Sequence, residues 1–324
     1  MASVGLVQAC NDARKAYRNW FESLAGRRKG RRVGHPRPRR KHGRQSARLT
    51  RNGFALHGER LYIAKVGDLR VAWSRSLPSP PSSVTVIREA DGRYYASFVV
   101  GREVTPLPPC DREVGIDLGL ASLIATSGGQ LIANPRFLRA RERKLVRAQR
   151  ALSRKQKGSA SRAKARHQVA VVHRKVREMR LDHAHKLALR LVRDNQAVYA
   201  EDLCVAGLVR TRLARSVCDA GWSQLLRLIE EKAAQYGRTF AKIGRFEPTT
   251  QVCSACGVNG GPKPLAIRSW QCQTCGAVHD RDINAAINIL AAGRADRLNA
   301  CGGGVSPGPA LAVAGEAATH RSAA

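Results

Sequence analysis

Four cysteines in the C-terminal third of the chain have the spacing of a metal site. Cys253 and Cys256 form one C-x-x-C turn, and Cys272 and Cys275 form a second turn further along the chain. Each turn is followed by a glycine, which suits the tight backbone path of a metal knuckle. Two such turns supply four thiolates in a tetrahedral arrangement, the ligand set of structural zinc. Four protein ligands leave no open coordination position, so we expect the zinc ion to be structural and not catalytic.

Three carboxylates stand where predicted structural elements end or begin. Asp117 ends the apolar run of "VGIDLGL", Glu201 follows an apolar stretch, and Asp282 opens the helix expected in "DINAAINIL". A carboxylate beside a buried strand is costly unless it is paired or binds a metal. Three carboxylates brought together can hold two Mg²⁺ ions about 3.5–4 Å apart, as in enzymes that hydrolyse phosphodiester bonds. Taken singly, Asp117 is equally compatible with a turn, and Asp282 with an ordinary helix N-cap.

The elements that must position these residues alternate between strands and helices. Short apolar runs predict the strands, and apolar positions at helical spacing predict the helices. Three meandering strands are followed by helix, strand, helix, strand and a last helix, which is the plan of an RNase H-like α/β nuclease. The predicted strands are 114–117, 123–125, 131–133, 197–200 and 239–243, and the helices between them are about 183–193 and 222–236.

The charge of the chain points to a polyanionic partner. Lysine and arginine number 57 against 24 acids, a formal net charge of +33 over 324 residues. No acid occurs between Arg27 and Gly58, and a second basic block at 136–180 predicts a helical hairpin broken near Gly158. Blocks of this kind are typical of proteins that neutralise the phosphates of nucleic acid, although a solvated helix face is the alternative.

Cysteine usage and hydropathy bear on the compartment. The chain has no apolar run of membrane-spanning length and no signal-peptide pattern after Met1. We therefore expect a cytoplasmic protein without a membrane partner, associated with the nucleoid when it binds DNA. In a reducing compartment, we expect cysteines without partner spacing to be buried thiols or spectators. These are Cys10, Cys110, Cys204, Cys218 and Cys301.

Residues 53–113 alternate between apolar and polar types and predict β-hairpins. Gly67-Asp68 and Asp91-Gly92 are the expected turns. Hairpins in this number suit a small β-barrel. Trp73, Tyr94 and Tyr95 offer rings that could stack on bases, although core or cross-strand packing is the more common role.

The combined motifs resemble the TnpB family of bacterial insertion sequences, relatives of the compact type V CRISPR effectors. The matching stretches are "VGIDLGL", "YAEDLCVAGLVRTRLARSVCDAGWSQLLRLIEEKAAQYGR", "RFEPTTQVCSACG" and "WQCQTCGAVHDRDINAAINIL". The resemblance implies a RuvC-like, RNase H-fold nuclease with a four-cysteine zinc ribbon inserted before its last helix. It assigns catalysis and Mg²⁺ binding to Asp117, Glu201 and Asp282. Asp282 is preferred over Asp280 because it occupies the family's D-x-N-A-A position.

The resemblance also implies the activity and the partners. Proteins of this family are RNA-guided DNA endonucleases: a guide RNA from the transposon end pairs with target double-stranded DNA, and one nuclease site cuts it. By comparison with the family, the N-terminal helical region is shortened. The expected layout is a basic helical recognition segment (1–52), a wedge-like β-barrel (53–113), the nuclease (114–244) with its basic hairpin (136–180), the zinc ribbon (245–280), the last nuclease helix (281–293) and a disordered tail (294–324).

Two other functions stay open at this point. One is a non-cleaving regulator that binds RNA or DNA, and the other is a direct or decayed transposase acting in DNA recombination. Loss of one of the three acids would indicate a non-cleaving protein, and all three are present. Guided cleavage is therefore the favoured function. The sequence does not distinguish a monomer from a dimer.

Overall fold

The computed structural model describes residues 3–38, 40, 43–103, 105–264 and 266–300. The chain divides into two compact units, Met1–Glu103 with Lys144–Arg174, and Val104–Arg143 with Lys175–Ala324. In the described ranges no helix is both long enough and apolar enough to cross a membrane.

The first unit contains two three-stranded antiparallel sheets that share one apolar core. One sheet has the order β1-β5-β6 and the other β2-β3-β4. Leu49 and Val84 from the first sheet and Phe54, Leu61 and Ile63 from the second are buried together. The elements are α1 (Ser3–Leu24), β1 (Gln45–Thr50), β2 (Phe54–His57), β3 (Arg60–Ile63), β4 (Gly67–Arg70), β5 (Ser83–Arg88) and β6 (Tyr94–Val99).

The two predicted hairpin turns have different outcomes. Asp91-Gly92 lies between β5 and β6, with Gly92 at φ 80°, so this turn is confirmed. Gly67-Asp68 is not the other turn, because these residues open β4; the turn precedes them and includes Lys65 at φ 69°. Strand β1, which the sequence analysis did not predict, pairs antiparallel with β5 along its length and buries Leu49 opposite Val84.

A helical hairpin follows the first strands of the second unit's sheet. α2 (Phe137–Ser153) and α3 (Ala160–Asp194) are separated by a turn that contains Gly158 at φ 90°, which confirms the predicted break. The guanidinium of Arg162 secures the turn by donating to the carbonyls of Leu152 (3.0 Å) and Lys155 (2.7 Å). The separate helix expected at 183–193 is wrong: α3 is continuous for 35 residues, since no glycine or proline interrupts it.

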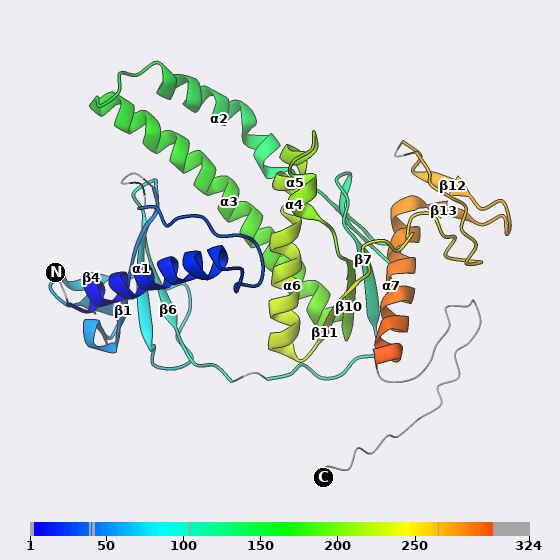
Figure 1. The fold of residues 1–324 in the computed structure, drawn as a ribbon, viewed down its shortest axis with the longest axis horizontal. Helices are drawn as coiled ribbons and strands as arrows, with labels where there is room; N and C mark the ends of the chain where they lie inside the picture. Colours follow the sequence, from blue (N-terminus) through cyan, green and yellow to red (C-terminus); the bar gives the residue numbers. More distant parts are fainter. Residues whose placement is uncertain (1–2, 39, 41–42, 104, 265, 301–324) are drawn as a thin grey trace, which may run out of the picture. The chain divides into compact units, whose positions relative to one another are not determined.

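The second unit is built on a five-stranded mixed sheet of order β11-β10-β7-β8-β9 (Figure 1). The first three strands form an antiparallel meander, while β10 and β11 run parallel to β7. This confirms the predicted order of strands and a mixed α/β fold. The strands are β7 (Glu113–Asp117), β8 (Ser122–Thr126), β9 (Leu131–Ala133), β10 (Ala197–Glu201) and β11 (Thr239–Ile243).

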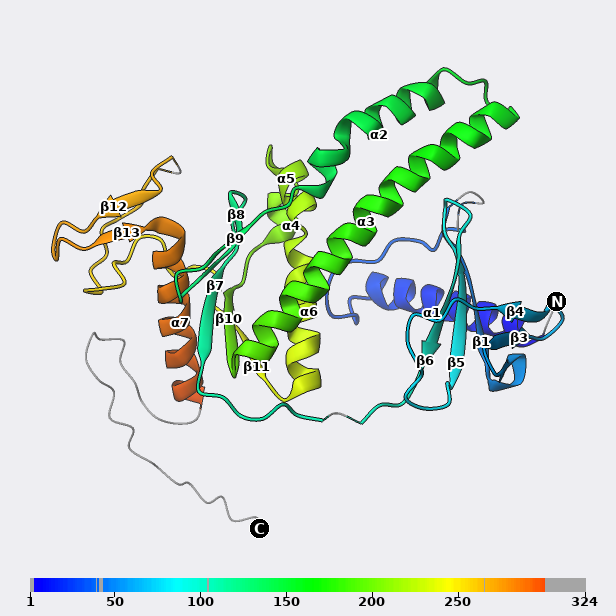
Figure 2. The same ribbon diagram turned by 180° about the vertical axis from the view of Figure 1, so that it is seen from behind.

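Helices cover both faces of this sheet. On one face α3, α5 (Ala214–Ala220) and α6 (Trp222–Tyr236) enclose the larger core, which includes Ile116, Val198 and Ala200. On the other face lies α7 (Arg281–Ala300) (Figure 2). Its Ile289 packs with Tyr199 and Ile243. Short α4 (Val205–Leu208) follows β10. Alternate residues of each strand therefore contact different helices.

One buried carboxylate joins three of these helices. Asp219 of α5 accepts hydrogen bonds from the backbone N–H groups of Leu138 (2.8 Å) and Arg139 (3.1 Å), in the first turn of α2. Arg180 of α3 donates to the same carboxylate at 3.2 Å. Asp219 thus satisfies free N–H groups at the start of α2 from a distant part of the chain, a role that no local sequence signal reveals.

Helix α7 lies so close to the sheet that no side chain would fit between them at two glycine positions. A Cβ atom on Gly115 of β7 would lie 2.5 Å from the backbone nitrogen of Leu290, and one on Gly293 would lie 2.5 Å from Cγ of Tyr199. Glycine on each side therefore brings the backbone of α7 against β7 and β10. The helix runs to Ala300, past residue 293 where the expected helix ends.

The extension of α7 is held by an ion-pair cluster at the start of β7. Arg294 donates to the carboxylate of Glu113 at 2.6 Å, and Arg297 bonds to its other oxygen. Burial opposes ionisation of Glu113, but the hydrogen bonds from the two arginines prevail and lower its pKa. The C-terminal part of the helix is thus tied to the strand. The rest of the expected tail, 301–324, lies outside the described residues.

Replacing Gly115 with alanine should force α7 away from β7. We expect Gly115→Ala to lower the free energy of unfolding by about 1–3 kcal/mol or more, as overpacking in a dense core does. Urea denaturation of the two proteins measures this change. Gly128→Ala is the matched control, because the nearest atom to its new Cβ would be 3.9 Å away. Equal stabilities for Gly115→Ala and the parent chain would show that α7 does not depend on this contact.

Candidate active site and metal centre

The three predicted carboxylates lie on the α7 side of the second unit's sheet. Asp117 ends β7 two residues after Gly115, so both face α7. Glu201 ends β10 and pairs with Ile243, a residue of the core beneath α7. Asp282 lies in the first turn of α7 itself. Strand alternation and helix placement thus bring three sequence-distant acids to one edge of the sheet.

The pKa shifts of these carboxylates reflect their proximity. Burial, together with the charges of Asp282 and Glu201, raises the pKa of Asp117 to about 7. Burial and the adjacent Asp202 raise the pKa of Glu201. A Cβ on Gly119 would lie 4.0 Å from Oδ2 of Asp282, which places that carboxylate against the loop that follows Asp117. A buried group of like charges is unfavourable alone and is therefore suited to cations.

The two aspartates near the start of α7 have different roles. Oδ1 of Asp280 accepts hydrogen bonds from the backbone N–H groups of Asp282 (2.9 Å) and Ile283 (3.0 Å). Asp280 is therefore the N-cap, and the alternative that Asp282 caps the helix is wrong. The Asp282 side chain is free of capping and contacts Arg268, whose Nη1 lies 3.4 Å away.

The carboxylates form an open group. Among the described residues, the four cysteines are the only His, Cys, Asp or Glu cluster whose ligand atoms all lie within 4.8 Å of one another. Asp117, Glu201 and Asp282 are therefore spread more widely than a closed single-ion cage. Mg²⁺ usually binds through one or two carboxylates and completes its shell with water and substrate phosphates. The donor set, all oxygen and partly buried, fits such ions.

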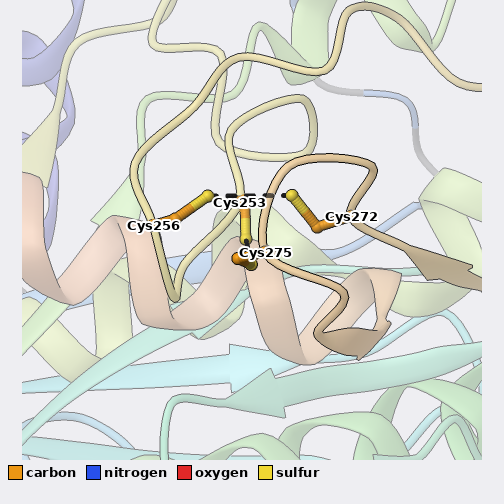
Figure 3. A group of neighbouring side chains, drawn as sticks. All are labelled: Cys253, Cys256, Cys272 and Cys275. Atoms are coloured by element: carbon orange, nitrogen blue, oxygen red, sulfur yellow. Dashed lines mark hydrogen bonds between the residues drawn. The ribbon is translucent and has the colours of Figure 1, made fainter.

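The four cysteines converge from two loops, as Figure 3 shows. Sγ of Cys253 lies 3.7 Å from that of Cys275, and Sγ of Cys256 lies 3.7 Å from that of Cys272. Thiolates about 2.3 Å from a central zinc ion would be about 3.8 Å apart in a tetrahedron. The geometry therefore fits a metal with four sulfur ligands.

The backbone favours thiolate at Cys272, whereas at Cys256 and Cys275 desolvation and the neighbouring sulfurs outweigh the backbone hydrogen bonds and raise the pKa. The N–H groups of Cys275 and Thr274 hydrogen-bond to the sulfur of Cys272 and lower its pKa to about 6. Gly257 and Gly276, the glycines after the two turns, have φ of 75° and 72°. Only glycine adopts this left-handed conformation without cost, so the knuckle turns predicted from sequence are confirmed.

Side chains of α7 bind the first knuckle directly. The Asn284 amide accepts from the backbone N–H of Ser254 (2.9 Å) and donates to the carbonyl of Val252 (2.8 Å). Asn288, one turn later, donates to the same carbonyl at 2.8 Å. The knuckle and the first turns of α7 are therefore one hydrogen-bonded structure.

The second knuckle connects to α7 through the strand that precedes it. β13 (Val278–Asp280) pairs with β12 (Ser269–Gln271), and Nε2 of His279 lies 3.0 Å from Sγ of Cys253. His279 is followed by the capping Asp280, so the metal ligands lead within a few residues to Asp282. The sequence analysis missed the asparagines and His279; their only sequence signal is their position within "HDRDINAAIN".

The aromatic residues of the first unit divide by environment. Trp73 stacks on Phe98, with ring centroids 5.3 Å apart, and its indole nitrogen donates to the carbonyl of Glu59. Trp73 therefore has a packing role, which is the more common of the two roles, packing and base stacking, that the sequence left open. Tyr94 and Tyr95 are exposed on β6, an edge strand.

Two family descriptions match adjacent parts of the chain. Residues 97–212 match OrfB_IS605, described as "Probable transposase", and residues 222–289 match "Cas12f1-like, TNB domain". The first range contains Asp117 and Glu201, and the second contains Asp282 and the four cysteines. Every candidate site residue therefore lies in a matched range.

Two curated proteins are similar to this chain over most of its length. A protein of Streptomyces pristinaespiralis, named "Putative RNA-guided DNA endonuclease", is 44% identical over 312 residues, which cover 95% of this chain and 75% of that protein. The Escherichia coli K12 protein named "Putative RNA-guided DNA endonuclease InsQ" is 30% identical over 325 residues, which cover 94% of this chain and 78% of InsQ.

One solved structure aligns with part of the chain. It is the "Cryo-EM structure of the Cas12f1-sgRNA-target DNA complex", with a TM-score of 0.46 and 19% sequence identity. The alignment covers 65% of this chain and 45% of that chain, so this chain spans less than half of the aligned protein.

Without magnesium, the Asp117 carboxyl should make stability depend on pH. Its pKa is about 7 in the folded chain against an ordinary 3.8, so between these values the folded chain holds a proton that the unfolded chain has lost. Stability therefore falls as pH rises through this window. We expect Asp117→Asn to be more stable than the parent chain above pH 7, by at most about 4 kcal/mol at 1.36 kcal/mol per pKa unit, and to have no advantage below about pH 4.

Urea denaturation between pH 4 and 8, without added Mg²⁺ and with zinc retained, measures this difference. Asp111→Asn, at an exposed aspartate outside the site, is the control. A constant difference between Asp117→Asn and the parent across this range would contradict the coupling of the three carboxylates.

Loss of one thiolate should release the metal and loosen the start of α7. We expect Cys253→Ser to lose bound zinc and to lower the melting temperature, since a metal ion bound only by the folded chain stabilises that fold. Mass spectrometry of metal content and a thermal melt measure both effects. Cys204→Ser and Cys218→Ser, at exposed cysteines outside the cluster, should retain the metal. Zinc retained at the parent level in Cys253→Ser would exclude the four-thiolate site.

Proposed function

This chain belongs to the TnpB family, and from that membership we propose that it is an RNA-guided, metal-dependent DNA endonuclease that hydrolyses phosphodiester bonds. The observation that carries the proposal is the convergence of Asp117, Glu201 and Asp282 at one sheet edge, with the pKa of Asp117 raised by burial and by the other two. A buried acidic group of this kind serves little purpose in a protein that only binds nucleic acid, because it repels phosphates.

Each carboxylate has a distinct structural origin and a common task. Asp117 and Glu201 end adjacent parallel strands, so their spacing is set by the sheet, whereas Asp282 is delivered by α7. Together they would hold two Mg²⁺ ions, which when bound supply an activated water and stabilise the charge on the leaving oxygen. The three carboxylates are partly desolvated, and electrostatic stabilisation of a developing charge is stronger in such a position than in water.

The four cysteines would hold zinc as a zinc ribbon. The role that we assign to this ribbon is to fix the start of α7 and with it Asp282. Asn284 and Asn288 support this role by their hydrogen bonds to Val252. Zinc bound by four thiolates has no open position for substrate, so the hydrolytic chemistry falls to the carboxylates.

The partners that we propose are a guide RNA and target double-stranded DNA. The relatives' printed names describe RNA-guided DNA endonucleases, and the net charge of +33 requires a polyanion of considerable size. The helix α2 carries six basic residues and has no buried side chain, so its basic groups are available to phosphates. The two small sheets of the first unit would form the wedge-like barrel.

Removing any one of the three acids should abolish cutting and spare RNA binding. The protein, purified from cells that carry its flanking DNA, is tested with its co-purified RNA and Mg²⁺ on plasmids matched to that RNA. We expect Asp117→Ala, Glu201→Ala and Asp282→Ala each to lower cleavage at least about 100-fold, since metal ligands are lost while phosphate contacts remain.

Asp280→Asn is the matched control, because asparagine also caps helices and this residue is outside the proposed metal shell. It should cut at close to the parent rate. Normal cutting by an alanine variant would remove that residue from the site. Absence of a defined RNA in the purified protein would contradict guided cleavage.

A further inference from the structure

A second concave site lies beside the carboxylates and takes no part in the mechanism above. It has a volume of about 340 Å³ and is enclosed by α6, the end of β11 and the segment after β10. Its lining combines apolar walls with charged groups. The residues are Asp202, Leu203, Cys204, Val205, Ala206, Ser223, Leu226, Arg227, Glu230, Lys242 and Arg245.

This cavity and the three acids share one edge of the sheet but face opposite sides. Glu201 pairs with Ile243 and points to the α7 side. Lys242, one residue earlier in β11, pairs with Ala200, which belongs to the core beneath α6. Adjacent strand residues point to opposite faces, so Lys242 enters the cavity from the α6 side. A strand of nucleic acid that crosses this edge would meet both sites in succession.

The lining suits a nucleotide. Leu203 and Leu226 offer apolar surface to a base, and Lys242 offers positive charge to a phosphate. Arg227 donates to Glu231 at 2.6 Å in an exposed ion pair, and Glu230 is the other acid of the lining besides Asp202. Asp202 does not oppose this charge, because Arg245 donates to its carboxylate at 2.6 Å and to its carbonyl at 3.1 Å. Across the described residues, Lys242 forms no ion pair. The volume is that of a site for a small ligand and too small for a duplex.

An exposed aromatic residue follows the last residue of the cavity lining in the chain. Phe246 follows Arg245 directly and is 93% exposed, the highest value among the exposed large hydrophobic residues of the described chain. The side chain of Arg245, the residue before it, is held by its two hydrogen bonds to Asp202. An exposed phenylalanine is unfavourable in water, whereas the face of its ring can stack on an unpaired base.

We propose that this cavity, with Phe246 at its rim, binds one unstacked nucleotide of the DNA strand that is being cut, within one or two positions of the scissile phosphate. Phe246 stacks on the base, and Lys242 contacts the flanking phosphate. This subsite rests on the proposed nuclease function and adds a positioning role to it: it fixes which phosphate reaches the carboxylates.

Photocrosslinking tests the subsite independently of cutting. The probes are single-stranded DNA oligonucleotides that carry 5-bromodeoxyuridine at successive positions, bound to the full chain with Asp117→Ala. Mass spectrometry locates the crosslinked residue. We expect one label position to crosslink to Phe246, and Lys242→Ala to weaken that crosslink about tenfold, the scale of one base-stacking or phosphate contact. Lys232→Ala, on the same helix as Arg227 but outside the cavity, should leave it unchanged.

Cleavage kinetics of the parent chain and Phe246→Ala complete the test. If the parent cuts, Phe246→Ala should cut at scattered positions or with a raised KM. A crosslink equally strong from all label positions, or equally weakened by Lys242→Ala and Lys232→Ala, overturns the subsite even in an active nuclease. A position-specific crosslink in a chain that cuts no matched target upholds the subsite as a nucleotide site and refutes the nuclease function alone.

Discussion

The close approach of α7 to β7 is the constraint on which the rest of the second unit depends. Gly115 lets the helix backbone lie against the strand, and Gly293 does the same at β10. Side chains of ordinary size at these positions would hold the helix away by the width of a methyl group or more. Asp282 would then move away from Asp117 and Glu201. A single missing Cβ on β7 therefore sets how closely Asp282 approaches Asp117 and Glu201, the spacing on which the proposed metal binding depends.

Three sets of interactions hold the helix in this position, and each has a different physical origin. Dense apolar packing of Ile289 acts at its centre, and ion pairs from Arg294 and Arg297 act at its far end. At its start, Asp280 caps the helix and Asn284 binds the first cysteine knuckle. The cysteine cluster is thus part of the support of the candidate active site, because the same few hydrogen bonds join the two.

The energetic conflict of the site is local and is resolved by its surroundings. Asp117 is buried beside two other carboxylates, which raises its pKa and costs stability in the metal-free chain. Natural proteins tolerate such violations at functional sites when packing elsewhere compensates for them. Here the compensation comes from the apolar core between the sheet and α3 and α6. The exposed Phe246, in the turn that follows β11, is a similar departure.

Much of this protein is determined by local sequence. Short apolar runs specify β9 and β11, and apolar positions at helical spacing specify α6, each at its observed bounds, because burial on one face and chain turns at the ends are local signals. The C-x-x-C turns with their glycines specify the metal knuckles, since only glycine suits the left-handed backbone there. The acids Asp117, Glu201 and Asp282 are identifiable from their positions at element ends.

Only tertiary structure decided which groups act together. That Asp280 and not Asp282 caps α7 depends on side-chain direction, which spacing does not specify. The roles of Asn284, Asp219 and Gly115 come from contacts with segments far away in the sequence, and no local pattern encodes such partners. Strand β1 was likewise not predicted from the sequence, because it pairs with the distant strand β5 and lies in a segment rich in charged residues. Local propensity selects elements, whereas packing between distant segments selects their neighbours.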